Sequence, residues 1–287
     1  MLVVSVASWA VPRLLCGGEA GLVRVGGECV GVTDGSYLFP AERASLAHAF
    51  PADDAAADAE FDRFAEDFRE VQAGIAEQND KVAASGDDYV KVAFLAPMTP
   101  QDDRSFDHTR LLSSLWGVLA AQKRINGSQD FYDPTYPAVQ VLLANEGDRQ
   151  EHWRHTAEEL VTLSRDADNP LVTAFGMPLS SQATQDSVAL LSAEGVPMVG
   201  GAAATDELNR EDVPGFVRAS PDVTDFTKAL SRRLAAEDLD RAMTVFDDAG
   251  LQEGPDRFVD SLRGAYARDI RSVERLSQQP YTGHSLV

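Results

Sequence analysis

The sequence predicts an α/β protein, with a parallel sheet flanked by helices and then an incomplete second α/β lobe. Four short apolar runs lie within residues 90–208 and are too brief to be helices. Segments with helical spacing separate these runs, and crossovers of this length join parallel strands. Turns rich in small residues follow three of the four runs, and α/β sheets bind small ligands at such strand ends.

The four predicted strands span residues 90–95, 138–144, 171–175 and 196–199. Because they are apolar throughout, we expect both faces of the sheet to be buried. The segments between them have helical spacing, which places a set of mainly apolar residues on one face. These residues are Leu111, Leu115, Val118, Leu119 and Gln122 in the first helix, Ala157, Leu160, Val161 and Ser164 in the second, and Val188, Leu190 and Leu191 in the third.

The pattern resumes after residue 208 as the start of a second α/β unit. The expected elements are a strand at 216–219, a helix at 222–236, a strand at 242–246, a helix at 254–266 and a strand at 270–273. We expect this lobe to be unfinished, because so small a sheet buries little. The predicted organisation is an apolar signal or membrane segment at 1–16, a flank at 17–88, an α/β lobe at 89–208 and a partial α/β lobe at 209–287.

The flank contains a glycine- and valine-rich stretch at residues 17–35, which predicts loops or a short hairpin. An amphipathic helix follows at 55–84, with an acidic back and an apolar stripe. The stripe consists of Phe61, Phe64, Phe68, Val71 and Ile75. Docking on the following domain is the favoured interpretation of this stripe, and pairing with another molecule is the alternative. The formal charge of −21 excludes nucleic acid as a partner, because phosphate binding needs clustered Lys and Arg.

The amino-terminal residues 1–11 are apolar but too few to span a bilayer. No Lys or Arg precedes them, so we expect a signal or membrane segment whose front is missing, and an extracytoplasmic, membrane-associated protein. Lipidation of Cys16 is an alternative. Cys16 and Cys29 are the only cysteines; we expect a disulfide if the flank is exported and two free thiols if the protein is cytosolic.

Catalytic signatures are mostly missing from the sequence. It has no phosphate-binding glycine loop and no nucleophile elbow, so we expect no nucleotide cofactor. His152 and His155 lie three residues apart beside three glutamates, which would permit a metal site. Their spacing matches no known zinc motif, so we interpret them as part of a solvated polar face and predict no metal.

Two turns carry the sharper signals. Ser180 and Ser181 immediately precede a predicted helix, where a serine caps the helix and the N–H groups attract a carboxylate. Small residues follow the next strand at 200–208, where they let a ligand approach the backbone, and Thr205 offers a hydroxyl. Two such turns on adjacent strand ends would form a cleft floor. Ligand binding and plain turn chemistry both remain open on spacing alone.

The order of these segments resembles the type I periplasmic binding protein superfamily, in its branched-chain amino acid binding or receptor ligand-binding branch. The resemblance covers residues 89–275 and is carried by the segments at 92–99, 117–126, 139–145, 174–184, 194–205 and 216–221. In amino-acid-binding members the two turns hold the ligand's carboxylate and ammonium groups. The resemblance therefore implies ligand contacts from Ser181, Ala203 and Thr205, with Ser180 as the alternative one register away. The loop at 247–251 lacks the aromatic residue that often closes over the ligand in this family.

We therefore expect an extracytoplasmic solute-binding protein of an ABC-type uptake system. It would bind a small polar ligand, such as an amino acid, in a cleft between two lobes and catalyse no reaction. Closure about a hinge would present the bound form to a membrane permease. One alternative is a membrane-tethered sensor that reports ligand to a signalling or defence module. Another is a hydrolase or isomerase that uses Ser180 and Ser181.

Overall fold

The computed structural model describes Cys16, residues 21–99, 106–127 and 136–237, and two short strands at 242–243 and 273–274. The predicted amino-terminal segment, apart from Cys16, and the predicted helix at 254–266 lie outside these residues.

The central sheet has seven strands in the order β1-β2-β4-β3-β5-β6-β7. The five strands from β3 to β7 pair in parallel, and β1 and β2 add an antiparallel hairpin at one side. This confirms the prediction of a mixed α/β fold with a mostly parallel sheet. The strands are β1 (Leu22–Val25), β2 (Glu28–Thr33), β3 (Tyr89–Ala96), β4 (Ala138–Asn145), β5 (Leu171–Gly176), β6 (Met198–Gly200) and β7 (Phe216–Arg218).

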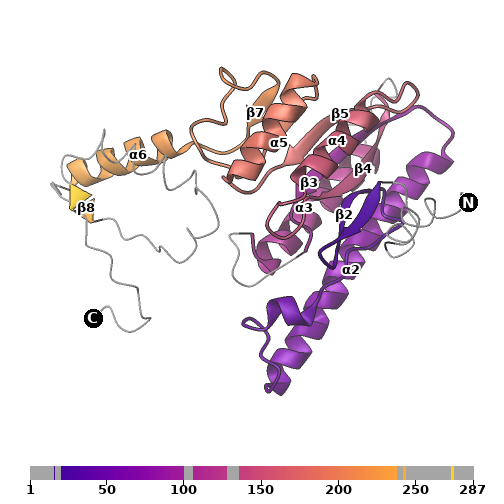
Figure 1. Cartoon of the computed structure of the whole chain (residues 1–287), viewed down its shortest axis with the longest axis horizontal. Helices are drawn as coiled ribbons and strands as arrows, with labels where there is room; N and C mark the ends of the chain where they lie inside the picture. The colour runs from indigo at the N-terminus through magenta and orange to yellow at the C-terminus, as the bar shows by residue number, and fades with distance from the viewer. Residues whose placement is uncertain are drawn as a thin grey trace, which may run out of the picture.

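Helices cover both faces of the sheet. α2 (Ala55–Ala84) and α3 (His108–Gly127) pack on one face, and α4 (Trp153–Ser164) and α5 (Gln182–Ala193) pack on the other (Figure 1). Strand β3 contributes to both cores, because successive side chains point to opposite faces. Phe94 faces the α2–α3 side and Leu95 faces the α4–α5 side. The chain runs first to β4 and then back past β3 to β5, as in doubly wound folds.

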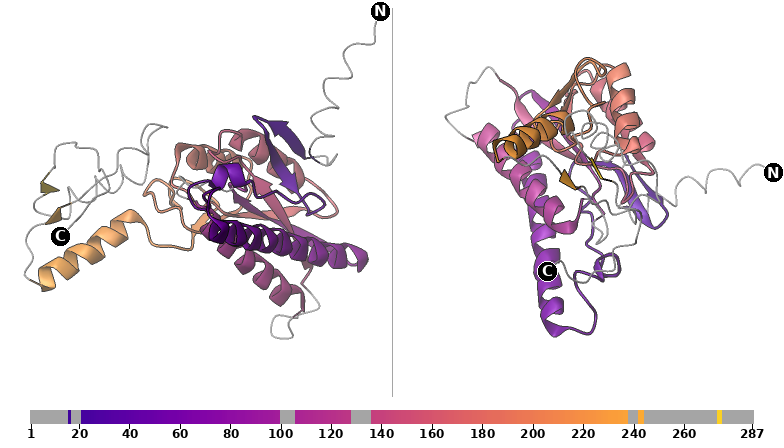
Figure 2. Two further views of the ribbon diagram at one scale, coloured as in Figure 1. Left: turned by 90° about the horizontal axis from the view of Figure 1, so that it is seen from below. Right: turned by 90° about the vertical axis from the view of Figure 1, so that its left-hand side faces the viewer.

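Helix α2 has the bounds that the sequence predicted. Asp54 starts it, because its carboxylate accepts hydrogen bonds from the N–H groups of Ala56 and Ala57. A short 3-10 helix, η1 (Arg43–Leu46), precedes it. Within the apolar stripe four side chains are buried and Phe61 is half-buried, so the docking prediction is confirmed. Figure 2 shows α2 and α3 side by side along one face. Of the helices that the structure describes, none is long and apolar enough to cross a membrane.

Three amide side chains pair with backbone groups, and two of them replace missing strand partners. Asn79 on α2 accepts from the Val141 N–H at 2.8 Å and donates to its carbonyl at 2.6 Å. Asn126 pairs with both groups of Val139 in the same way, at 2.9 Å each. Val139 and Val141 need these partners because β2 pairs with β4 only from Leu143 onwards. The third amide, Gln72, pairs with both backbone groups of Phe39 and so fixes the segment before α2.

The hairpin of β1 and β2 is closed by a disulfide between Cys16 and Cys29. The hairpin prediction is therefore confirmed, and of the alternatives left open for the cysteines the structure has the paired form. The sequence did not indicate that β2 would join the sheet. It does so by pairing antiparallel with the last residues of β4, from Leu143 to Asn145.

The strand expected at 216–219 is present, but its position in the fold differs from the prediction. It is not the start of a second unit but β7, which pairs in parallel with β6 as the fifth parallel strand. The reason is packing: the Phe216 ring is buried in the α4–α5 core and lies over Gly200, where a Cβ atom would come within 2.4 Å of it. The chain continues into α6 (Val223–Ala236), which projects away from the sheet (Figure 1). Strands β8 (Ala242–Met243) and β9 (Val273–Glu274) pair in parallel.

We predict that replacing Asn79 by Asp destabilises the protein by on the order of 3 kcal/mol, because a carboxylate would face the Val141 and Asp34 carbonyls that the amide now binds. Urea unfolding at neutral pH measures the change. Gln78→Glu, the same amide-to-acid change at the neighbouring, half-buried position, is the matched control. Equal losses in the two variants would contradict the role given to Asn79.

We predict that removing the disulfide lowers the free energy of unfolding by about 3 kcal/mol, because the bond closes a loop with a sequence separation of 13 residues. The comparison is a thermal melt of the protein with and without reductant, beside a Cys16→Ser, Cys29→Ser double variant. Reductant should lower the melting temperature of the protein and leave that of the double variant unchanged. If reductant leaves the melting temperature of the protein unchanged, the hairpin does not depend on the disulfide.

Candidate functional site

The turns that follow the parallel strands meet along one side of the sheet, which we call the carboxyl edge. It comprises residues 97–99 after β3, 146–152 after β4, 177–181 after β5 and 201–205 after β6. All the ligand-binding residues predicted from the sequence lie here. In doubly wound sheets this edge is where small ligands bind.

Asn145, the last residue of β4, holds three parts of this edge together and is completely buried. Its side-chain oxygen accepts hydrogen bonds from the N–H groups of Met98, at 2.8 Å, and Gly147, at 3.0 Å. Its amide nitrogen donates to the carbonyl of Cys29 at 2.8 Å. The carboxyl edge is therefore tied to the disulfide hairpin through one side chain.

The serine turn begins α5 as predicted. Ser181 is the N-cap residue, and its hydroxyl oxygen accepts from the Thr184 N–H at 3.0 Å. The same hydroxyl donates to the side-chain oxygen of Gln150 at 2.5 Å. Gly176 permits the sharp turn before it, because its φ is +111° and a Cβ atom would lie 2.7 Å from the Leu95 carbonyl. Ser181 is half-buried, so part of it remains open to solvent.

The structure brings the two predicted turns together. The Gly201 N–H donates to the Gly176 carbonyl at 2.6 Å, and the Ala203 N–H donates to the Met177 carbonyl at 3.2 Å. The Ala204 N–H donates to the Ser180 hydroxyl at 2.9 Å. The turns after β5 and β6 are thus joined to each other by hydrogen bonds.

The four predicted ligand-binding residues differ in accessibility. Ser180 and Ser181 are half-buried, whereas Ala203 and Thr205 are completely buried. The Thr205 hydroxyl donates to Glu207, and its carbonyl accepts from Arg218 at 2.9 Å. Direct contact with a ligand stays a prediction for all four. In this arrangement Ser180 and Ser181 are accessible to a ligand from solvent, while Ala203 and Thr205 are buried within the turn after β6.

Sequence reasoning missed Glu146 and Gln150, which lie behind the serine turn and are each 1% exposed. Glu146 accepts from the Gln150 amide at 2.8 Å, and the same amide nitrogen donates to Thr184 at 3.0 Å. Burial raises the pKa of Glu146 to about 7, against the opposing effect of Gln150 and Ser187. Gln150 has a φ of 60°, a left-handed backbone that is costly for a residue other than glycine. The only sequence signal was the position of Glu146 directly after a strand.

An acidic pair lies where the hairpin meets this edge. Glu28 on β2 accepts from the Asp148 N–H at 3.0 Å, and Asp148 is itself 7% exposed. Burial and the negative charge of Asp148 raise the pKa of Glu28 to about 7. The hairpin therefore brings a further proton-binding carboxyl to the edge.

The two histidines of α4 are both half-buried. His152 is the N-cap residue of α4, and its backbone N–H donates to the Glu146 carbonyl at 3.2 Å. His155 faces the hairpin, where its Nε2 atom would come within 3.3 Å of a Cβ at Gly31. Within the described part of the chain, no three His, Cys, Asp or Glu side chains are grouped so that they could hold a metal ion.

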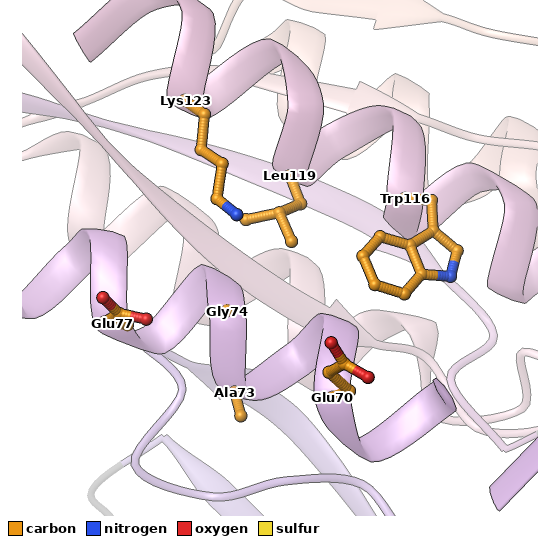
Figure 3. A pocket seen from close by; sticks show the side chains of 7 residues that line it. All are labelled: Glu70, Ala73, Gly74, Glu77, Trp116, Leu119 and Lys123. Carbon is orange, nitrogen blue, oxygen red and sulfur yellow. The ribbon is translucent and has the colours of Figure 1, made fainter. Parts of the chain in front are cut away.

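A groove of about 240 Å³ lies elsewhere, between α2 and α3 (Figure 3). Its floor forms because Gly74 lets the helices approach, since a Cβ there would lie 2.8 Å from Leu119. Trp116 of α3 lines one side of the groove and is 38% exposed. Two glutamates of α2 and Lys123 of α3 line the rest. Among the residues that the structure describes, those that line this groove belong to α2 and α3 and none lies at the carboxyl edge.

Comparisons with known proteins do not assign a family. A scan against models of known protein families gives no match, and a search of the curated proteins gives none either.

We predict that Glu146 makes the free energy of unfolding depend on pH. Its pKa is raised from 4.5 to about 7, so the folded protein keeps a proton that the unfolded chain releases above about pH 4.5. Stability should fall as the pH rises towards 7 and then level off. A difference of 2.5 pKa units corresponds to a loss on the order of 3 kcal/mol.

Glu146→Gln tests this, because glutamine imitates the protonated acid. The variant should match the protein near pH 4.5 and exceed it in stability by on the order of 3 kcal/mol above pH 7. Urea unfolding across this range gives the values. Glu158→Gln, at an exposed position of α4, is the control and should follow the protein throughout. A constant offset between Glu146→Gln and the protein would contradict the assignment.

Proposed function

We propose that the chain is the ligand-binding part of an extracytoplasmic solute-binding protein of an ABC-type uptake system. The ligand is a small polar molecule, such as an amino acid, held at the carboxyl edge. The observation that carries this proposal is the joining of the two turns after β5 and β6, which places Ser180 beside Ala204 at the strand ends. This is the arrangement that the resemblance to type I periplasmic binding proteins implies.

The chemistry of the serine turn suits an anionic group. The amino-terminal end of α5 carries the positive end of the helix dipole, and its cap residue Ser181 is half-buried. Ser180 lies beside it and is equally accessible. A ligand carboxylate at this point would gain the helix end and the Ser180 O–H, because the Ser180 oxygen only accepts in its bond with the Ala204 N–H. The Ser181 hydroxyl donates to an amide oxygen, which cannot take up its proton, so the geometry favours binding over nucleophilic chemistry.

The start of the second lobe is tied to the other side of the floor. Arg218, at the end of β7, donates to the Thr205 carbonyl, and the Thr224 hydroxyl of α6 donates to Asp206 at 2.8 Å. Parallel pairing of β8 with β9 supports a further α/β unit after α6, because parallel strands need a crossover between them. A movement of α6 would therefore act directly on the Thr205 turn. We propose that this joint transmits closure, and that a membrane permease recognises the closed form.

The disulfide supports the location. Disulfides persist in oxidising compartments and are rare in the cytosol. The bond between Cys16 and Cys29 lies in a hairpin whose Cys29 carbonyl is bound by Asn145 at the carboxyl edge. An oxidising surrounding thus stabilises the same edge that we propose binds the ligand.

We predict that at least one amino acid raises the melting temperature, because a ligand bound by the folded state alone stabilises it. The measurement is a thermal-shift screen of the purified chain against amino acids, small amides and sugars. Ser180→Ala with Ser181→Ala should abolish the shift. Asp54→Ala, which removes the cap of α2 and leaves the serine turn unchanged, controls for the loss of a helix cap. A shift that survives in the double variant would place the ligand elsewhere.

A further inference from the structure

Two buried oxygen atoms behind the serine turn lack hydrogen-bond partners. They are Glu146 Oε1 and Ser187 Oγ, and each residue is 1% exposed. Ser187 lies on α5 close enough to Glu146 to lower its pKa in part. A single proton on Glu146 would satisfy both atoms, because the carboxylic acid O–H could donate to the Ser187 hydroxyl. The contacts that the structure gives the Glu146 carboxyl come from the neutral Gln150 and Ser187, so its burial favours the protonated acid.

A short chain of hydrogen bonds joins this acid to the serine turn. The Gln150 amide donates to Glu146 at 2.8 Å, and the Gln150 oxygen accepts from Ser181 at 2.5 Å. Gln150 is held rigidly, since Thr184 contacts both ends of its amide, at 3.0 Å and 3.3 Å. One side chain, that of Gln150, therefore connects the Glu146 carboxyl group with Ser181, the residue that caps α5.

Four further titratable residues lie on the elements that meet here. They are Glu28 of the hairpin, Asp148 of the loop after β4, His152 at the N-cap position of α4 and Asp186 of α5. Asp186 accepts a hydrogen bond from Gln182 at 2.8 Å, and Glu28 and Asp148 are bound to each other. Burial, and not a neighbouring charge, is the main cause of the raised pKa of Glu146. Ionising Glu146 would add a negative charge to an edge that is already acidic.

We propose that Glu146 is a proton-binding site that controls the carboxyl edge, so that a small ligand bearing a carboxylate binds at the α5 amino terminus with the uptake of one proton. This inference rests on the proposed function and specifies the ligand class and its regulation. Glu146 acts through Gln150 and is a positioning residue. When ionised, it competes with the ligand carboxylate for the same positive helix end, in a buried site where like charges repel strongly.

The expected consequence is a pH-dependent affinity. Binding and protonation are linked, so the affinity should fall by about tenfold for each pH unit above the Glu146 pKa. Ligands without a carboxylate should show no such dependence. The protein would then bind its ligand more tightly at a low extracellular pH than at a high one.

The test uses L-alanine, L-leucine and L-serine, each beside the amino alcohol in which a CH₂OH group replaces the carboxylate. Titration calorimetry at about pH 6 and about pH 8, on either side of the Glu146 pKa, gives the affinities. We expect at least one amino acid to bind about tenfold more weakly at the higher pH. Glu146→Gln should bind it equally at both, with the affinity that the protein has at low pH, and Glu158→Gln should behave as the protein does.

Ser187→Ala provides a second variant in which Glu146 keeps its carboxyl group. The Ser187 hydroxyl lowers the Glu146 pKa in part, so its loss should raise that pKa further and the fall in affinity should begin at a higher pH. An amino acid that binds with the same pH dependence in Glu146→Gln as in the protein would overturn this inference and leave the proposed function standing. Binding of no amino acid to either protein at either pH would contradict both.

Discussion

The buried side chain of Asn145 is the constraint on which the carboxyl edge depends. It accepts from Met98 and Gly147 and donates to the Cys29 carbonyl, so it links the turn after β3, the turn after β4 and the disulfide hairpin. Met98 and Gly147 lie in turns outside the strands, and a buried group without a partner costs more than a hydrogen bond gains. One amide therefore ties two irregular turns to the hairpin, and the position of Glu146 follows from it, because Glu146 is the next residue along the chain.

The same solution recurs on the other side of the sheet. Asn79 and Asn126 pair with backbone groups of β4 where β2 no longer reaches, so a helix completes a strand. This docks α2 without an eighth strand and leaves its acidic face in solvent. The fold thus combines apolar packing, which sets the layers, with a few buried amides, which set the register between helix and strand. Glu146 departs from this pattern, because an acid occupies a place where the other positions have amides.

Much of the fold could be predicted because periodicity survives in a single sequence. The run at 55–84 alternates apolar and acidic residues at helical spacing, and α2 has those bounds. The serine turn was recognisable because a cap residue stands before a helical segment, and Ser181 does cap α5. By contrast, β7 was expected in the second unit. A strand of three residues carries no sequence signal that indicates which strand it pairs with. Glu146 was missed for a related reason: burial of a polar residue in a charged loop leaves no periodic trace.

By itself the sequence determined the elements, their order and the parallel character of the sheet, because hydrophobic period and turn chemistry are local properties. Only the tertiary structure decided that the hairpin extends the sheet, that the turns after β5 and β6 are bonded to each other, and that Glu146 and Gln150 lie buried behind Ser181. These facts depend on contacts between residues far apart in the chain. A proton-binding acid becomes recognisable only when the solvent around it is known, and that is a property of packing.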